Sequence, residues 1–110
     1  MFQINMEFVR GMLFVRLEGI LNRRSCYKLN NYLVPVILKH KIKYLVYNMY
    51  LLEDIDESGL DALLNTKCAI RTNKGKICLC EVSKNLEKSI KRLKIKKTAN
   101  ELTALRLIEV

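Results

Sequence analysis

The spacing of apolar residues changes along this chain from the period of a β-strand to the period of a helix. Over residues 2–8 every second residue is apolar, and the alternation resumes over residues 13–17 after a break at Gly11. A period of two is typical of a strand with one buried face, so the two runs predict a β-hairpin. From Ser25 onward apolar residues recur at helical spacing, which predicts that a helix follows the hairpin.

The predicted first helix extends from Ser25 to His40 and contains the chain's one proline. Either Asn22 or Ser25 can accept hydrogen bonds from the free backbone N–H groups at its start. Pro35 lacks a backbone N–H, so we expect the helix to kink or to divide there. His40 falls at the end of the helix and is a weak candidate for catalysis, because no second catalytic group accompanies it.

The rest of the chain alternates between strand-like and helix-like segments. Apolar runs at 44–49 and 77–82 predict two further strands. Helical spacing predicts helices beginning near residue 57, near residue 83 and after residues 98–101, which have the residue types of a capping box. With a short strand near residue 95, this order implies an α/β fold with a mixed sheet of four or five strands and about four helices packed against it.

Length and composition predict one cytoplasmic domain covering residues 1–110. Half of the residues are hydrophobic, which is enough for a packed core. No apolar run reaches the roughly 18–20 residues that a membrane-spanning helix needs, so we expect no membrane insertion. The first residues lack the basic and apolar regions of a signal peptide.

The four cysteines are few and unevenly spaced, unlike those of a small disulfide scaffold. Cys78 and Cys80 lie two apart on a predicted strand, so their side chains share one face. As metal ligands they would need two further donors, and the chain has one histidine. We therefore expect all four thiols to be reduced and packed, and we expect no metal or other cofactor.

The formal net charge of +9 favours acidic partners. Seven lysines and arginines fall within residues 84–97. This stretch is either the solvated face of a helix or a docking surface for an acidic protein. Nucleic acid is the least favoured ligand, because no aromatic residue interleaves the basic ones.

Residues 56–60, with the sequence Asp-Glu-Ser-Gly-Leu, stand at the predicted start of the second helix. Asp56 can cap that helix, the helix dipole favours the carboxylate of Glu57, and Gly59 lets another backbone approach closely. One interpretation is simply a well-capped helix start. The other is a recognition loop or phosphorylation switch, because a phosphate is favoured at a helix N-terminus.

The strand at 44–48, the loop after it and the segment 55–60 resemble the signature of the STAS family of anti-sigma factor antagonists. In that family an apolar strand leads through a short loop into Asp-Ser-[Ser/Thr]-Gly-Leu at the start of a helix. The hairpin, the Leu-Glu-Gly-Ile-Leu-Asn turn at 17–22 and the closing helices extend the resemblance over the chain. It implies a bacterial protein-interaction domain that regulates transcription by binding an anti-sigma factor of the ATP-binding kinase type.

The sequence departs from the family pattern at the switch. The serine that is phosphorylated in switching antagonists corresponds to Glu57, and the second Ser/Thr corresponds to Ser58. Two acidic positions of the family correspond to Asn22 and Asn48, which are neutral. Either Glu57 imitates a phosphoserine, with about one charge where phosphoserine carries roughly 1.5 to 2, or Ser58 has become the acceptor. A third interpretation of Ser58 is a helix-terminal hydroxyl bonded to backbone.

The resemblance places a partner-binding surface on seven residues, with Ser58 as a possible phosphorylation site. These residues are Asn22, Asn48, Asp56, Glu57, Ser58, Gly59 and Leu60. We expect no catalytic residues, because the chain offers no nucleophile–base pair and no Gly-x-Gly loop. Two alternatives stay open, a STAS docking subunit of a membrane transporter or stress-sensing complex and a basic nucleic-acid-binding protein. The chain is expected to be a monomer or a homodimer.

Overall fold

The computed structural model describes residues 1–109, with side chains as far as Leu107. It contains a five-stranded mixed sheet with the spatial order β1-β2-β3-β4-β5. Strand β1 (Gln3–Val9) pairs antiparallel with β2 (Met12–Leu21), while β2, β3 (Tyr44–Ile55), β4 (Lys76–Cys80) and β5 (Lys96–Thr98) are parallel neighbours. The mixed sheet and the order of elements confirm the predicted α/β class.

The hairpin turn consists of Arg10 and Gly11, both with positive φ angles, of 52° and 83°. A two-residue loop of this kind matches the right-handed twist of the flanking strands. It joins β1 to β2 in a continuous register from Gln3 opposite Glu18 to Val9 opposite Met12. The predicted β-hairpin is therefore confirmed, with Gly11 in the turn, but the apolar face expected to be buried is exposed at Met6 and Phe8 of β1.

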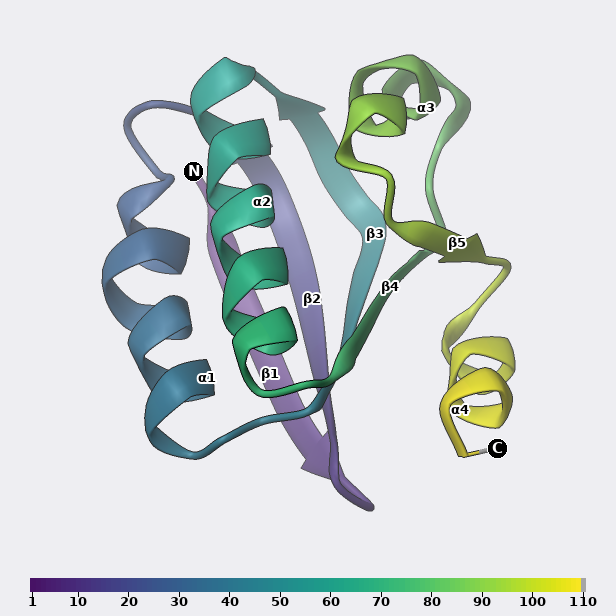
Figure 1. The fold of residues 1–110 in the computed structure, drawn as a ribbon. Coiled ribbons are helices and arrows are strands. Elements are labelled where there is room, and N and C mark those ends of the chain that lie inside the picture. The colour runs from purple at the N-terminus through teal and green to yellow at the C-terminus, as the bar shows by residue number, and fades with distance from the viewer. Residues whose placement is uncertain (110) are drawn as a thin grey trace.

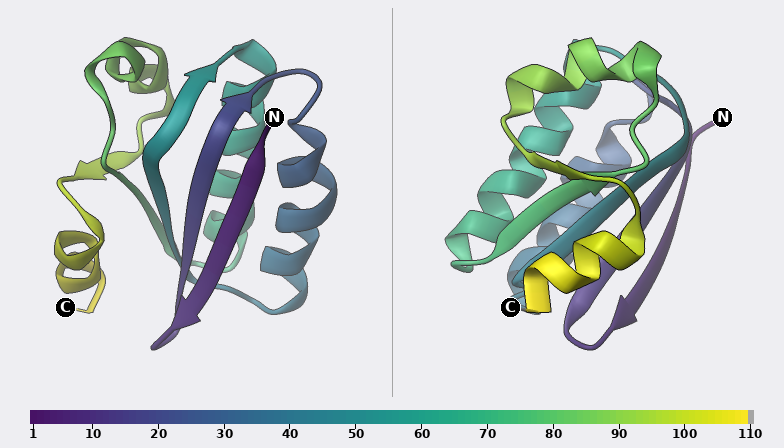
Figure 2. Two further views of the ribbon diagram at one scale, coloured as in Figure 1. Left: turned by 180° about the vertical axis from the view of Figure 1, so that it is seen from behind. Right: turned by 90° about the vertical axis from the view of Figure 1, so that its right-hand side faces the viewer.

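Helices cover the two faces of the sheet unequally (Figures 1 and 2). A six-residue π-helical segment, η1 (Lys28–Leu33), continues into α1 (Val34–Lys39) and packs with α2 (Glu57–Thr72) on one face. Helix α3 (Lys84–Ile90) contacts β3, and the 3₁₀ turn η2 (Lys91–Leu93) that follows it contacts α2. Helix α4 (Glu101–Glu109) packs on the opposite face, against β3, β4 and β5.

Side-chain alternation along the strands divides the core into two clusters. The larger cluster lies between the sheet and the first three α-helices, and its fully buried members include Val15, Tyr47 and Leu63. The smaller cluster lies between the sheet and α4. Its members are Met12, Phe14, Val46, Cys78, Cys80 and Ala104. Each central strand thus has two buried faces, as its nearly continuous apolar run predicted.

The first helical region changes from π-helix to α-helix at Val34, next to Pro35, which occupies one of the first two positions of α1. Leu33 and Val34 are both right-handed, so the helix runs on through this point, and the predicted kink or division takes the form of a change of helix type. His40 is the C-terminal cap residue of α1, which confirms its place at the helix end.

The acidic residues Glu53 and Asp54 lie in β3, not in the loop that the sequence predicted. The strand continues to Ile55 and stays paired with β2 through two register shifts. Leu52 and Ile55 are buried in the larger cluster, and their burial explains why the chain stays extended beyond Met49.

The buried stripe of α2 runs along one side of the helix from Gly59 to Ile70. Cys68 is exposed, so the expectation of four packed cysteines is wrong at this position. The stripe continues instead through Thr66 and Ile70, three and seven residues after the buried Leu63. The hydroxyl of Tyr47 donates a hydrogen bond of 2.8 Å to Thr66 Oγ1, which satisfies both polar groups inside the core.

Cys78 and Cys80 share the face of β4 that α4 covers, as their spacing predicted. Burial raises the pKa of the Cys78 thiol to about 11 and that of Cys80 to about 12. All four cysteines are free, and Cys26 is half-buried.

The capping box expected at residues 98–101 is not formed. The side chain of Asn100 caps α4, with Oδ1 accepting a hydrogen bond of 2.8 Å from the backbone N–H of Thr103. The carboxylate of Glu101, which a capping box would turn back toward the helix start, binds Arg16 instead. Among residues 1–109, no helix has the length and apolar character needed to span a bilayer.

Candidate functional site

Strands β2 and β3 end side by side, which places the segments after them at the same edge of the sheet. Leu21 pairs with Ile55, and the backbone N–H of Asp56 donates a hydrogen bond of 3.2 Å to the carbonyl of Leu21. The loop beginning at Asn22 and the start of α2 are therefore neighbours, although more than thirty residues separate them in sequence.

The carboxylate of Asp56 joins these two segments. Its Oδ1 accepts a hydrogen bond of 2.9 Å from the backbone N–H of Gly59, and this bond caps α2. Its Oδ2 accepts a hydrogen bond of 3.1 Å from the backbone N–H of Arg23. The predicted capping role of Asp56 is confirmed, and the second bond fixes the β2–η1 loop to the helix start.

Gly59 packs directly against the end of β2. A Cβ atom at this position would overlap the carbonyl oxygen of Leu21 and lie 2.7 Å from the side chain of Ile55. The prediction that Gly59 permits the close approach of another backbone is therefore confirmed. Leu60 is also buried, in the larger core cluster, so Gly59 and Leu60 both hold the start of α2 against the rest of the domain.

Asp56 and Glu57 are exposed and Ser58 is half-buried, while Gly59 and Leu60 are buried. The Glu57 side chain is 74% exposed, and its Oε1 lies 2.6 Å from Nη1 of Arg92 in η2. The carboxylate raises the pKa of the Arg92 guanidinium, although both groups are exposed and such pairs contribute little to stability. The half-buried Ser58 forms no side-chain hydrogen bond with any residue from 1 to 109, so the backbone bond considered for it is absent there.

Asn22 shapes the loop beside Asp56. Its Oδ1 accepts hydrogen bonds from the backbone N–H groups of Arg24, at 2.9 Å, and Ser25, at 3.2 Å. In return, Oγ of Ser25 accepts a hydrogen bond of 2.9 Å from the Asn22 backbone N–H. The first helical segment begins at Lys28 with Tyr27 as its N-cap and has no side-chain cap bond, so Asn22 and Ser25 close the turn before the helix and do not cap the helix itself.

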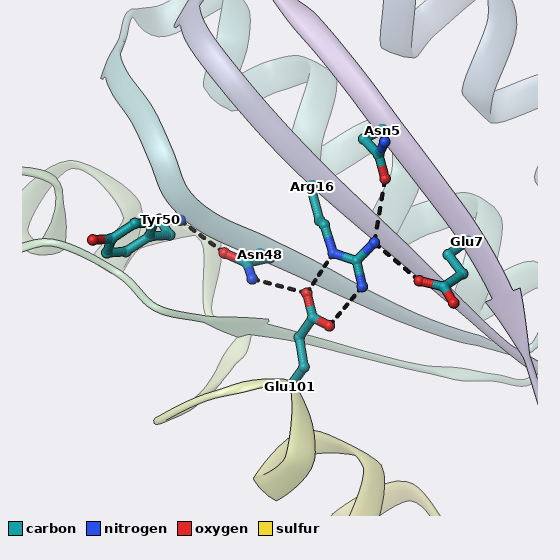
Figure 3. A network of polar contacts seen from close by, with 6 residues as sticks. All are labelled: Asn5, Glu7, Arg16, Asn48, Tyr50 and Glu101. Atoms are coloured by element: carbon teal, nitrogen blue, oxygen red, sulfur yellow. Dashed lines mark hydrogen bonds and ion pairs between the residues drawn. The ribbon is translucent and has the colours of Figure 1, made fainter.

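Asn48 lies apart from the other predicted site residues. It stands in the middle of β3 on the face that α4 covers (Figure 3). Its Nδ2 donates a hydrogen bond of 2.8 Å to Glu101 Oε2, and its Oδ1 accepts one of 2.9 Å from the backbone N–H of Tyr50. Because β3 is longer than predicted, Asn48 does not mark the end of the strand. The structure therefore unites Asn22 with the Asp56–Leu60 segment but does not bring Asn48 to it.

Comparison with known proteins assigns the fold to a family. The model of the STAS domain family matches residues 3–104. The chain belongs to the STAS domain family. An anti-sigma F factor antagonist from Paenibacillus polymyxa is 28% identical over 112 residues, which cover 98% of this chain and 96% of that relative. The resemblance seen in the sequence is therefore confirmed.

Two solved structures of the anti-sigma factor antagonist SpoIIAA share the fold. The unphosphorylated form has a TM-score of 0.81 and 19% identity, over 97% of this chain and 98% of that one. The phosphorylated form, from Bacillus, has a TM-score of 0.75 and 16% identity, over 96% of this chain and 99% of that one.

In this STAS domain two hydrogen bonds of Asp56 hold the start of α2 in place. Asp56 is occupied in two hydrogen bonds, while Glu57 and Ser58 offer a carboxylate and a hydroxyl to a partner. No group of three or more His, Cys, Asp or Glu side chains within residues 1–109 is placed to hold a metal ion. These features suit recognition by a protein. Sequence reasoning did not find the contact between Glu57 and Arg92, because no local pattern links residues 35 positions apart.

Proposed function

We propose that this STAS domain is an anti-sigma factor antagonist that binds its partner through the exposed start of α2. The partner is an anti-sigma factor of the ATP-binding kinase type, and its capture in the cytoplasm frees a sigma factor. The observation that carries the proposal is the rigid presentation of Glu57 and Ser58 by the Asp56 cap and by the close packing of Gly59. The name of the Paenibacillus polymyxa relative supports the choice of partner.

The domain itself acts without catalysis in this proposal. An antagonist works by competition, because occupying the anti-sigma factor removes it from the sigma factor. A preformed loop favours tight binding, since little conformational entropy is lost when the partner binds. The proposed contact surface consists of Asp56, Glu57 and Ser58, with Asn22 and the buried Gly59 and Leu60 holding its shape.

Glu57 gives this surface a permanent negative charge at the position where the family carries a phosphorylated serine. We infer that this charge weakens partner binding less than a phosphoserine would. One reason is that the carboxylate carries about one charge, against roughly 1.5 to 2 for a phosphoserine. The other is that Arg92 lies beside it and offsets part of that charge. The domain would then bind its partner with one intermediate affinity, which does not depend on phosphorylation by a kinase.

Ser58 offers a second, modifiable position on the same surface. Its hydroxyl is free of side-chain hydrogen bonds to the part of the chain that the structure describes, and it lies in the first turn of α2, where a phosphate is favoured. A phosphate at Ser58 would add charge beside Glu57. Intact-mass analysis of protein from native cells, grown in exponential and stationary phase, would detect it.

The binding experiment compares wild-type protein with Glu57→Ser by affinity capture from native cell extract, followed by titration with the purified anti-sigma factor. Glu57→Ser removes the permanent charge, so in the titration without ATP, where the new serine stays unphosphorylated, we expect binding to tighten by about tenfold. Glu18→Ser is the matched control, because it removes an equal charge from an exposed position on β2. Equal affinity of wild type and Glu57→Ser would contradict the proposed role of Glu57. Recovery of transporter subunits in place of an anti-sigma factor would reassign the partner.

A further inference from the structure

Four lysines line a cleft of about 510 Å³ between α3 and β5. They are Lys84, Lys88, Lys91 and Lys97. Ile90 and Ile95 form its apolar floor, and both are buried, with exposed fractions of 2% and 9%. Glu87 is the one acidic residue in the lining. The cleft thus combines four positive charges with a small apolar base.

The four ammonium groups have no partner of opposite charge among residues 1–109, in hydrogen bonds or in ion pairs. Lys67, by contrast, has a structural role nearby, since its Nζ donates hydrogen bonds to the carbonyls of Leu93 and Lys94. Lys84 and Lys88 are four residues apart on α3, and like charges at that spacing destabilise a helix. Glu87, four residues before Lys91, offsets part of this charge, and an anionic ligand would relieve the repulsion that remains.

The cleft adjoins the proposed partner-binding surface. Arg92 follows Lys91 directly in η2, and it makes the ion pair with Glu57 at the start of α2. In Figure 1, α3 lies at the end of the sheet where β3 passes into α2. A partner that covers Glu57 and Ser58 would thus also reach the lysines of α3.

We propose that this cleft is a docking site for an acidic segment of the partner protein. The identity of the partner rests on the proposed function, but the acidic character of its docking segment is inferred from the lysines that line the cleft. Residues four apart on a helix rise by about 6 Å, so Lys84 and Lys88 match carboxylates one turn apart on a partner helix. The floor of Ile90 and Ile95 takes an aliphatic side chain between those carboxylates.

The lining favours a protein over a nucleic acid. Single-stranded nucleic acids bind through bases stacked on aromatic side chains, and no residue lining this cleft is aromatic. Lysine ammonium groups are point charges on flexible stems, suited to several scattered carboxylates. The acidic segment would also strengthen attraction before contact, so the cleft is expected to speed association and to make it depend on salt.

The test uses two probes of matched charge, a ten-residue oligoglutamate peptide and an eleven-nucleotide oligothymidylate. Each is titrated into folded full-length protein at 50 and 200 mM salt. The cleft variant changes Lys84, Lys88, Lys91 and Lys97 to Gln. The control variant changes Lys39, Lys41, Lys74 and Lys76 to Gln, at exposed positions at the opposite end of the sheet. Both variants lower the formal net charge by four, from +9 to +5.

We expect the peptide to bind at least tenfold more weakly to the cleft variant, and less than threefold more weakly to the control. Backbone amide shifts should concentrate in α3 and β5. Equal losses in the two variants would mean general charge attraction and would overturn the proposal. Stronger binding of oligothymidylate with the same dependence on the cleft lysines would also overturn it, in favour of nucleic acid.

This titration is independent of the experiment with the anti-sigma factor. If the Glu57→Ser comparison fails while the peptide binds in the cleft, the docking site is still supported. Only the identity of the protein that carries the acidic segment then changes. If the peptide does not distinguish the two lysine variants, the docking site is wrong even when an anti-sigma factor is captured.

Discussion

The guanidinium of Arg16 in β2 forms a bidentate ion pair with the carboxylate of Glu101 at the start of α4. Both N–O distances are 2.8 Å, and Asn48 donates a third hydrogen bond of 2.8 Å to the same carboxylate. Bidentate pairs of this kind are among the stronger polar contacts in proteins. Among the residues of α4 whose side chains are described, as far as Leu107, Ala104 is buried in the smaller cluster and Leu105 packs partly buried against it. The polar contact of Glu101 adds to this apolar attachment of the helix to the sheet.

Replacing Glu101 with Gln should destabilise the domain by about 1 kcal/mol at pH 7, because the pair with Arg16 is only partly exposed. Urea unfolding measures the change. Glu7→Gln is the matched control, since Glu7 contacts the same guanidinium through one longer distance of 3.1 Å and is 55% exposed. A loss at Glu7 as large as that at Glu101 would contradict the assignment.

The ion pair of Arg16 and Glu101 should also make the stability of the domain depend on pH. Hydrogen bonding to Arg16 lowers the pKa of Glu101 below its ordinary value of 4.5 in the folded state. The folded state therefore binds fewer protons than the unfolded state between the two pKa values. The contribution of Glu101 is full above pH 4.5 and is lost as the pH falls through the lowered value. Accordingly, the difference between wild type and Glu101→Gln should shrink from pH 7 to pH 3.

Gly59→Ala should destabilise the domain by about 1–3 kcal/mol, because the new methyl group overlaps the carbonyl oxygen of Leu21. The same overlap should displace the loop and weaken partner binding. Ser58→Ala, one residue earlier, is the control and should stay within about 0.5 kcal/mol of wild type in urea unfolding. If Gly59→Ala is as stable as Ser58→Ala, the close packing of β2 against α2 is not required.

The parts of this fold that could be predicted from the sequence depend on neighbouring residues. Strand alternation around Gly11, the change of helix type next to Pro35 and the cap by Asp56 are each decided within a few positions. The length of β3 could not be predicted this way. It depends on pairing with β2 through two register shifts, and on burial of Leu52 against distant helices.

The same distinction between local features and contacts distant in sequence applies to the candidate site. The Asp56–Leu60 segment was found because a cap, a glycine and a family signature coincide within five residues. The placement of Asn48 was missed, because its partner Glu101 lies 53 residues away in a helix on the other face of the sheet. The contact of Arg92 with Glu57 was missed for the same reason, although Arg92 belongs to the basic stretch at residues 84–97 that the sequence analysis noted.

The buried hydroxyl pair of Tyr47 and Thr66 should respond unequally to its two deletions. Thr66→Val leaves the fully buried Tyr47 hydroxyl without its partner, which costs about 1–3 kcal/mol. Tyr47→Phe should cost only about 1 kcal/mol, since Thr66 Oγ1 still donates to the carbonyl of Leu63 at 2.7 Å. Urea unfolding of both variants and of the double variant measures the order. Equal losses, or losses that add fully in the double variant, would argue against this pairing.

The ion pair between Glu57 and Arg92 should matter for binding and not for folding. Both side chains are exposed, so Arg92→Gln should leave the urea midpoint unchanged. It should weaken binding of the anti-sigma factor, because the Glu57 carboxylate then faces the partner without a neighbouring cation. In the background of Glu57→Ser there is no carboxylate to offset, so Arg92→Gln should have a smaller effect. A double-mutant cycle on the dissociation constant measures this coupling.

Lys94→Gln, an exposed neighbour, controls for the loss of one positive charge. Zero coupling between Arg92 and Glu57 would mean that Arg92 does not offset the permanent charge, and that Glu57 presents it to the partner in full.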